Sequence, residues 1–395
     1  MAVAAMPVGR DVRAIGLIGF GHFLSHFYMF GLAPLLPLFH RDLGVSYTEL
    51  GIILTAYNVA IAALQTPMGV LVDRVGARRV LIAGMFLTAG AFALAGFATS
   101  YWELVFLFLL SGAGNSVFHP ADYVILTASV DESRHGRAYS MHSFGGSLGT
   151  AAGPVAMALL LTQTDWRSAL IIAGVVGIAL SFVFIFSGDT LREDAKTRKK
   201  ADATTPLRSM INRAVILLFL FYMLTSACNI ALTGFSAVVL PRLYGVTIEE
   251  ASYMLSALLF STAAGTLFGG WLADRTKRHD RILVLAFGLY AILLFTVGTA
   301  RIPIAAVIGA FVLGGFVRGV VNPSRDMMVR EIAPAGALGT VFAFVSTGFN
   351  IGQGFAPILY GVLLDHGLNN EVLYLAGGFI ALSVGLLFFS RSRTL

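Results

Sequence analysis

Residues 168–186 read SALIIAGVVGIALSFVFIF and contain no charged side chain and no histidine. A run of this length can cross the roughly 30 Å hydrocarbon core of a bilayer as one tilted α-helix, because a helix rises about 1.5 Å per residue. Similar runs lie at 80–97 and 282–299. Apolar and polar residues do not alternate along them, as they do in the strands of a membrane barrel. These runs therefore predict membrane-spanning helices.

The composition of the whole chain agrees with this prediction. Of its 395 residues, 57% are hydrophobic and 12% are charged, whereas a soluble domain carries about 25% charged residues. No soluble core would hide that much apolar surface, and within lipid the backbone must satisfy its own hydrogen bonds. We therefore predict an all-α membrane protein with twelve spans, at 14–39, 48–71, 79–98, 102–128, 138–162, 166–187, 213–240, 249–273, 282–300, 303–329, 336–363 and 370–390.

The positions of Lys and Arg predict the topology. An even number of spans places both termini on one side, and 21 of the 27 basic residues fall in segments on that side. Four fall on the other side, and Arg318 and Arg325 lie within the tenth span. This asymmetry is typical of cytoplasmic loops. We expect a multi-pass inner (plasma) membrane protein with cytoplasmic termini, whose net charge of +6 requires no nucleic-acid partner.

One sustained polar segment, 189–206, divides the spans six and six. The predicted organisation is an N-terminal six-helix bundle at 1–188, a cytoplasmic linker at 189–212 and a C-terminal six-helix bundle at 213–395. We interpret the linker as a solvated tether, with binding to lipid or a partner as the alternative.

Three signals recur in the second half of the chain. The loop GVLVDRVGARR at 69–79 has a counterpart, GWLADRTKR, at 270–278. His119-Pro120-Ala-Asp122 corresponds to Asn322-Pro323-Ser-Arg325, and Gly149 with Pro154 corresponds to Gly352 with Pro357, both at an offset of 203 residues. A constant offset predicts two pseudo-symmetric bundles related by an axis along the membrane normal, with a solute site near the bilayer midplane.

The loop at 69–79 resembles the signature of the major facilitator superfamily, and its counterpart lies where that family has a second copy. The sequences FHPA at 118–121 and GGSLG at 145–149, together with a histidine in the first span, are similar to the fosmidomycin-resistance branch of efflux proteins. The resemblance covers essentially the whole chain. It implies a secondary transporter in which spans one, four, seven and ten line a central cavity.

Asp73 ends the second span, where it can accept charged hydrogen bonds or cap a neighbouring helix. We hypothesise that Asp73 and Asp274 latch a cytoplasmic gate, although the neighbouring arginines can serve topology alone. Glycines allow close helix packing, and we expect Pro34, Pro37, Pro120, Pro154, Pro323 and Pro357 to interrupt helices. The predicted gating residues are Asp73, Arg74, Arg78, Arg79, Asp274, Arg275, Arg325, Gly149, Gly153 and Pro154.

Polar residues within the spans concentrate where the resemblance places the cavity. Such groups cost several kcal/mol in hydrocarbon unless they face water or one another, so they indicate a polar path. The third, sixth, ninth and twelfth spans have no Asp, Glu, Lys, Arg or His in their interiors, and we expect them to lie outside. The predicted substrate-contacting residues are Arg318, His22, His26, Asn115, Asn229, Asn58, Asn322, Asn350, Gln353 and Tyr28.

Arg318 lies roughly 22 Å into the tenth span. A guanidinium stays charged and suits a carboxylate, phosphate or phosphonate, so we interpret Arg318 as an anion anchor, with a structural ion pair as the alternative. Asp122 and its repeat counterpart Arg325 have similar depths. They can form a bridge between the bundles that exists only when the inner side is closed, or a static packing pair.

The groups expected to carry protons are Asp122, His119 and His142, with His22 and His26 beside them. Imidazole titrates near neutral pH, which suits exchange of a proton for a solute, whereas hydrogen-bonded packing is the alternative role. His22 and His26 lie four residues apart on one helical face, which also suits a metal ion. Cavity histidines are commoner than metal sites, so we expect no metal and no cofactor.

The predicted function is a proton-coupled antiporter that exports a small anionic or amphipathic organic compound. A proton-coupled importer of an organic acid is the alternative. The polar groups form no recognisable nucleophile or acid–base set, so the chain is not predicted to be an enzyme, and a sensor would need an output domain. Cys228 is interpreted as an apolar filler. The expected partners are a small-molecule substrate, protons and the bilayer, with a monomeric protein.

Overall fold

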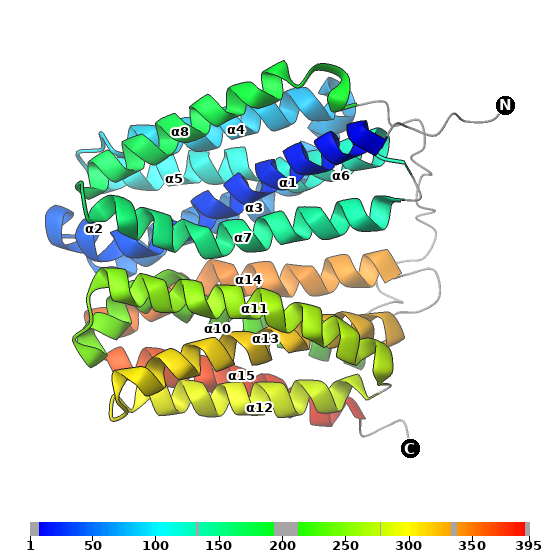
Figure 1. The fold of residues 1–395 in the computed structure, drawn as a ribbon. Coiled ribbons are helices and arrows are strands. Elements are labelled where there is room, and N and C mark those ends of the chain that lie inside the picture. Colours follow the sequence, from blue (N-terminus) through cyan, green and yellow to red (C-terminus); the bar gives the residue numbers. More distant parts are fainter. Residues whose placement is uncertain (1–7, 132–133, 193–211, 277, 333–337, 392–395) are drawn as a thin grey trace. The chain divides into compact units, whose positions relative to one another are not determined.

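The computed structural model describes residues 8–131, 134–192, 212–276, 278–332 and 338–391 (Figure 1). Throughout these residues the regular structure is helical, with no strand. The helices of the first half are α1 (Val8–Phe30), η1 (Ala33–Leu35), α2 (Leu36–Leu43), α3 (Tyr47–Val75), α4 (Ala77–Ala95), α5 (Tyr101–Asn115), α6 (Phe118–Ser129), α7 (His135–Leu161), α8 (Trp166–Phe186) and η3 (Gly188–Thr190). Those of the second half are α10 (Arg213–Tyr244), α11 (Ile248–Arg275), α12 (His279–Gly298), α13 (Ile304–Ile332), α14 (Leu338–Asp365) and α15 (Asn369–Arg391).

Twelve long helical segments correspond to the twelve predicted spans. Eleven of those in the described residues are long and apolar enough to cross a bilayer, and α14 is the twelfth. Many of their large apolar side chains point outward, with Phe186 81%, Leu267 78% and Leu285 73% exposed. So much apolar surface in contact with water would be unfavourable, whereas lipid accepts it. The chain is therefore an all-helical, multi-pass membrane protein, as predicted.

Polar residues in the short loops explain where several helices begin. Ser100 and Glu103 form a capping box at α5, and Thr247 and Glu250 form another at α11. Such boxes satisfy backbone N–H groups that lack a partner in the first turn. Asp165, between α7 and α8, accepts a 2.7 Å hydrogen bond from the Ser168 backbone N–H. This bond stabilises the charged form and holds the pKa of Asp165 below its usual value.

Two predicted spans are broken by proline. The first span ends as α1 at Phe30 and continues through the 3-10 turn that contains Pro34 into α2. The fourth is split between Asn115 and Phe118, which places Pro120 in the first turn of α6, where its missing N–H is tolerated.

The expectation that the other prolines interrupt helices was wrong for Pro154, Pro323 and Pro357. These lie inside the continuous helices α7, α13 and α14. One proline removes one backbone hydrogen bond, and neighbouring groups in a membrane bundle can satisfy the freed carbonyl.

The described residues form two compact units, one within 1–45 and 56–200 and the other within 46–55 and 201–395. In the first unit α1 packs along α7, and α4 packs along both α5 and α8. In the second unit α10 packs along α14, and α12 packs along both α13 and α15. The same pairing thus recurs in each unit, which confirms the pseudo-symmetric repeat. The predicted linker falls largely on 193–211, outside the described residues.

Equivalent glycines make the closest of these helix contacts. A Cβ atom at Gly149 of α7 would overlap the Phe23 backbone carbonyl of α1, and one at Gly352 of α14 would overlap that of Met223 in α10. At Gly153 a Cβ would lie 2.7 Å from the Phe27 carbonyl oxygen. These contacts let α1 carry its polar side chains close to those of α7. The gating role of Gly149, Gly153 and Pro154 stays a prediction.

Candidate functional site

The first unit gathers five titratable side chains from three helices, here called the histidine cluster. His22 and His26 come from α1, His119 and Asp122 from α6, and His142 from α7. Spacings of four residues on α1 and three on α6 turn each pair toward one side of its helix. Asp122 is 0%, His142 1% and His22 4% exposed. The structure therefore brings all three predicted proton-carrying residues together with the two histidines of the first span.

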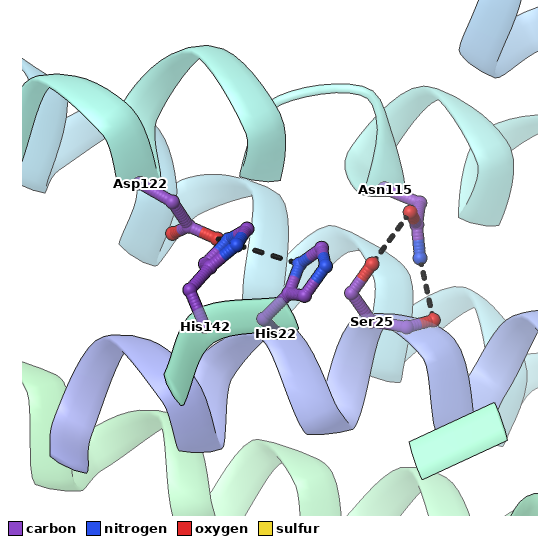
Figure 2. A network of polar contacts seen from close by, with 5 residues as sticks. All are labelled: His22, Ser25, Asn115, Asp122 and His142. Carbon is purple, nitrogen blue, oxygen red and sulfur yellow. Dashed lines mark hydrogen bonds and ion pairs between the residues drawn. The ribbon is translucent and has the colours of Figure 1, made fainter. Parts of the chain in front are cut away.

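Asp122 is the centre of this cluster. Its Oδ2 atom lies 2.9 Å from His142 Nε2 and 3.6 Å from His22 Nδ1 (Figure 2). The other carboxylate oxygen, Oδ1, has no hydrogen-bond partner among the described residues. An ionised carboxylate that is fully buried is costly unless a positive charge balances it. Asp122 therefore requires either a proton of its own or a protonated imidazole beside it.

The imidazole rings lie close enough to restrict one another's charge. The His22 ring stacks on that of His142, with centroids 3.7 Å apart, and meets the edges of His26 at 4.6 Å and His119 at 4.9 Å. Like charges at these separations repel strongly in a medium of low dielectric. The four rings cannot all be protonated together, so protons added to the cluster are shared.

A hydrogen-bond chain orients His26. Its Nδ1 atom lies 2.7 Å from the Thr150 hydroxyl, and that hydroxyl donates to the Gly146 carbonyl at 2.9 Å. Because a hydroxyl has one proton to donate, Nδ1 of His26 must be the donor to Thr150. When the ring is neutral, Nε2 of His26 therefore carries no proton and can accept a hydrogen bond or a proton from another member of the cluster.

Gly146 makes room for the cluster, a role that sequence reasoning missed. A Cβ atom at this position would lie 2.6 Å from His22 Cδ2, 2.7 Å from His22 Nε2 and 3.2 Å from His26 Nε2. From sequence we expect the glycines at 145–149 to serve helix packing, with Gly149 also in the gate, and no contact with the histidines is predicted. Only the tertiary structure shows that one of them faces imidazole rings.

The histidine cluster also meets the spacing for metal ligation. Ligand atoms of His22, His26 and His119 lie within 4.8 Å of one another, and so do those of His22, Asp122 and His142. In the second group the His142 nitrogen and the Asp122 oxygen already share a hydrogen bond. The contacts thus fit proton sharing, and the expected absence of a metal stays a prediction.

The second unit contains a polar cavity, here called the Arg318 cavity, of about 250 Å³. It lies among α10, α12, α13, α14 and α15 and is lined by Thr225, Cys228, Asn229, Phe287, Tyr290, Arg318, Asn322, Arg325, Phe349 and Ile380. Three predicted substrate-contacting residues, Arg318, Asn229 and Asn322, thus share one cavity. Cys228 is a buried lining residue, and its role as an apolar filler stays a prediction.

Arg318 lines this cavity and has no counterion among the residues that the structure describes. Among the described residues no acidic side chain lies within ion-pair distance of it, and its Nη1 atom is buried without a hydrogen-bond partner. Arg325, by contrast, lies 3.0 Å from Asp326 through Nη2. A guanidinium without an acidic partner in a small, partly enclosed cavity can bind an anionic group.

Two further residues that line the cavity, Asn229 and Tyr290, each have a buried polar atom. The Asn229 Oδ1 atom and the Tyr290 hydroxyl are both buried and unsatisfied among the described residues, and Tyr290 is 2% exposed. Asn322 donates to the Thr266 hydroxyl at 3.3 Å. Tyr290 lies on α12, the predicted ninth span, which we expected to lie outside the polar path. A lone tyrosine in an apolar run carries no sequence signal that separates it from a packing residue.

The remaining predicted substrate-contacting residues lie elsewhere. Asn115 exchanges two 2.9 Å hydrogen bonds with Ser25, beside the histidine cluster (Figure 2). Tyr28 is buried against α8 and donates to the Ala173 carbonyl at 2.9 Å. Three others line neither the Arg318 cavity nor the histidine cluster: Asn58, which is half-buried, Asn350, which is exposed, and Gln353, which is buried.

The predicted gating residues take several positions. Arg78 donates to the Phe184 and Ile185 carbonyls, at 3.3 and 2.6 Å, and so binds the C-terminal end of α8. Arg275 lies over the ring of Trp271 at 4.1 Å. Asp73, Arg74 and Arg79 are exposed at the junction of α3 and α4. The side chain of Asp274 lies outside the described residues, so the latch stays a prediction.

The two members of the predicted Asp122–Arg325 bridge each have a partner within their own unit. Asp122 binds His142, and Arg325 binds its neighbour Asp326. Adjacent residues on a helix usually point apart, so the pairing of Arg325 with Asp326 was not expected from sequence.

Comparisons with known proteins agree with this architecture. The family model of the Major Facilitator Superfamily matches residues 18–247 and 219–395. The fosmidomycin resistance protein of Escherichia coli K12 is 24% identical over 376 residues, covering 93% of this chain and 90% of that protein. The probable sulfoacetate transporter SauU of Cupriavidus necator is 24% identical over 399 residues, covering 94% and 91%.

A solved structure shows the same fold. It is that of a bacterial homologue of the human lysosomal transporter Spinster, inward-facing and unoccupied, with a TM-score of 0.80 at 14% identity and 98% coverage of both chains. The family model spans both helical units, and these relatives are membrane transporters rather than enzymes. This chain therefore belongs to the Major Facilitator Superfamily of membrane transporters.

Proposed function

We propose that this protein is a proton-coupled antiporter that exports a small anionic or amphipathic organic compound across the bacterial inner membrane, with both termini in the cytoplasm. The observation that carries the proposal is the fully buried Asp122, held by His142 and His22. A carboxylate in this environment changes its charge together with its neighbours, and this is the chemistry that a proton-coupled cycle requires.

The substrate class follows from the second unit. The Arg318 guanidinium lacks an acidic partner among the described residues, and Tyr290 and Asn229 line the cavity beside it. These groups suit an anionic head group, while Phe287, Phe349 and Ile380 can contact an apolar body. The name of the Cupriavidus necator relative, a sulfoacetate transporter, supports an organic anion, and that of the Escherichia coli relative, a resistance protein, supports export.

In the proposed cycle the histidine cluster and the Arg318 cavity fill alternately. Protons bind the cluster when it is open to the acidic outer side, and they leave when it is open to the cytoplasm. Release of protons from the histidine cluster to the cytoplasm is coupled to binding of the anion in the Arg318 cavity. The free energy of the proton gradient then drives the anion outward, because each state binds one of the two ligands better.

Asp122→Asn tests the coupling. Purified protein in liposomes is supplied with radiolabelled fosmidomycin or isethionate, with or without a pH gradient, and counterflow is measured in the absence of a gradient. We expect Asp122→Asn to retain counterflow while losing gradient-driven transport by about tenfold or more, because the amide cannot exchange the proton. Ser147→Ala, an exposed change on the same helix as His142, is the matched control.

Two outcomes contradict the proposal. Transport by the unaltered protein that ignores the pH gradient excludes proton coupling. Asp122→Asn protein that keeps gradient-driven transport excludes this carboxylate as the proton carrier.

Import of an organic acid with protons is the second candidate function, because the unpaired Arg318 suits uptake of an anion equally well. Deletion of the gene separates the two directions. An exporter's loss raises the internal concentration of its substrate, whereas an importer's loss lowers it.

A further inference from the structure

The Arg318 cavity is lined by two arginines, but only one carries an uncompensated charge. Arg325 contacts Asp326 Oδ1 through Nε at 3.1 Å and through Nη2 at 3.0 Å. The Tyr222 hydroxyl donates to the same oxygen at 3.0 Å, and the Arg325 guanidinium lies 4.5 Å from the centre of the Tyr222 ring. Asp326 is thus held by Arg325 and by the Tyr222 hydroxyl, and its negative charge offsets the positive charge of Arg325.

Arg318 has no such partner among the described residues. The other lining side chains of the cavity are neutral. The cavity and the acid beside it therefore carry a net charge of one positive unit. A ligand with one negative charge balances this positive charge, whereas a second negative charge would enter the partly enclosed cavity without a counterion.

We propose that Asp326 is a specificity-determining residue, which by neutralising Arg325 restricts the Arg318 cavity to ligands whose head group carries a single negative charge, such as a sulfonate or a carboxylate. This inference rests on the proposed binding of an anion at Arg318. Asp326 lies outside the lining of the cavity, so it acts through Arg325 rather than by touching the ligand. Its predicted effect is on selectivity.

Two ligands of similar size but different charge test whether the cavity prefers a single negative charge. Isethionate carries one negative charge at neutral pH, and sulfoacetate carries a second on a carboxylate in place of the hydroxymethyl group. Binding to purified full-length protein is measured by isothermal titration at low ionic strength. We expect the unaltered protein to prefer isethionate by about tenfold or more, the scale of one unbalanced charge at short range.

Asp326→Asn removes the acid while keeping its shape and its acceptor oxygen. Arg325 then adds its charge to the cavity, and the preference for isethionate is expected to disappear or reverse. In the double variant Arg325→Gln with Asp326→Asn the net charge returns to one, and the preference for isethionate should return. Tyr222→Phe removes a hydrogen bond to Asp326 without changing any charge, so it should shift the ratio by no more than about threefold.

A purely structural role for Asp326 would weaken both probes equally, and an unchanged ratio in Asp326→Asn protein refutes the proposal. If that variant fails to fold, Arg325→Gln replaces it. The remaining acid then offsets Arg318, so binding of isethionate should fall by about tenfold, and unchanged binding refutes the proposal. If the unaltered protein binds neither probe better than Arg318→Gln protein does, the anion site itself is refuted, and with it the proposal.

Discussion

Replacement of Gly146 by alanine tests whether the histidine cluster depends on the space that this glycine leaves. An added Cβ would lie 2.6 Å from His22 Cδ2, whereas non-bonded carbon atoms prefer separations of about 3.5–4.0 Å. The His22 ring would have to move by roughly 1 Å. The His22 ring has little room to move, because the centroid of the His142 ring lies 3.7 Å from its own. His26 and His119 make edge contacts with it on other sides.

The two contributions to stability have opposite signs. Alanine in a helix is favoured over glycine by roughly 0.5–1 kcal/mol, whereas overpacking a filled site costs about 1–3 kcal/mol. We therefore expect Gly146→Ala to lower the free energy of unfolding by roughly 1 kcal/mol. The displaced His22 would also lose its 3.6 Å approach to Asp122, so gradient-driven transport should fall by more than counterflow does.

The assay pairs thermal unfolding of the purified protein with the two transport measurements. Gly16→Ala on α1 is the matched control, because a Cβ at Gly16 meets nothing within 4 Å. That variant should be slightly stabilised and should transport normally. If Gly146→Ala protein matches the Gly16→Ala control in stability and in coupled transport, the packing argument for His22 is refuted.

Three further predictions use other parts of the molecule. Arg318→Lys should raise the apparent substrate constant about tenfold or abolish transport, since an ammonium lacks the planar donors of a guanidinium, and unchanged kinetics would exclude the anion anchor. Tyr290→Phe should weaken binding of isethionate by about threefold to tenfold through loss of one hydroxyl, and equal affinity by titration would show that this hydroxyl does not contact the ligand. Asp11→Asn removes the buried acid that accepts from Arg134 at 2.6 Å, so it should lower the free energy of unfolding by about 1–3 kcal/mol. Arg41 pairs with Asp42 at the exposed surface, so Arg41→Gln should lower the melting temperature by clearly less in the same experiment, and equal losses would contradict this ranking.

Sequence reasoning located the helices and most of the polar residues that the structure groups together. Long uncharged runs and the distribution of Lys and Arg indicate a membrane protein directly. A charged residue is costly in the hydrocarbon core, so spans are uncharged and Lys and Arg collect in the cytoplasmic loops. His22, Asp122 and Arg318 were identified for the same reason. A charge within a span is costly, and it persists only where a polar environment surrounds it.

The partners of these residues were harder to predict. Repeat symmetry suggested Asp122 as the partner of Arg325, yet Arg325 contacts its own neighbour, Asp326. Tyr290 lies in an outer span and resembles a packing residue in sequence, but it lines the Arg318 cavity. Pairings of this kind depend on side-chain direction and on distances of a few ångströms, which spacing along the chain does not determine.

A duplicated bundle of membrane helices follows from the amino-acid sequence alone, because length, apolarity and loop charge are properties of each segment. The tertiary structure decided which polar atoms meet. It brought His142 of α7 to Asp122 of α6 and made room for His22 at Gly146. Within the part of the chain that the structure describes, it left Arg318 without an acid while Arg325 has one. Electrostatic energy depends on separation and on the surrounding medium, and both exist only after the helices have packed.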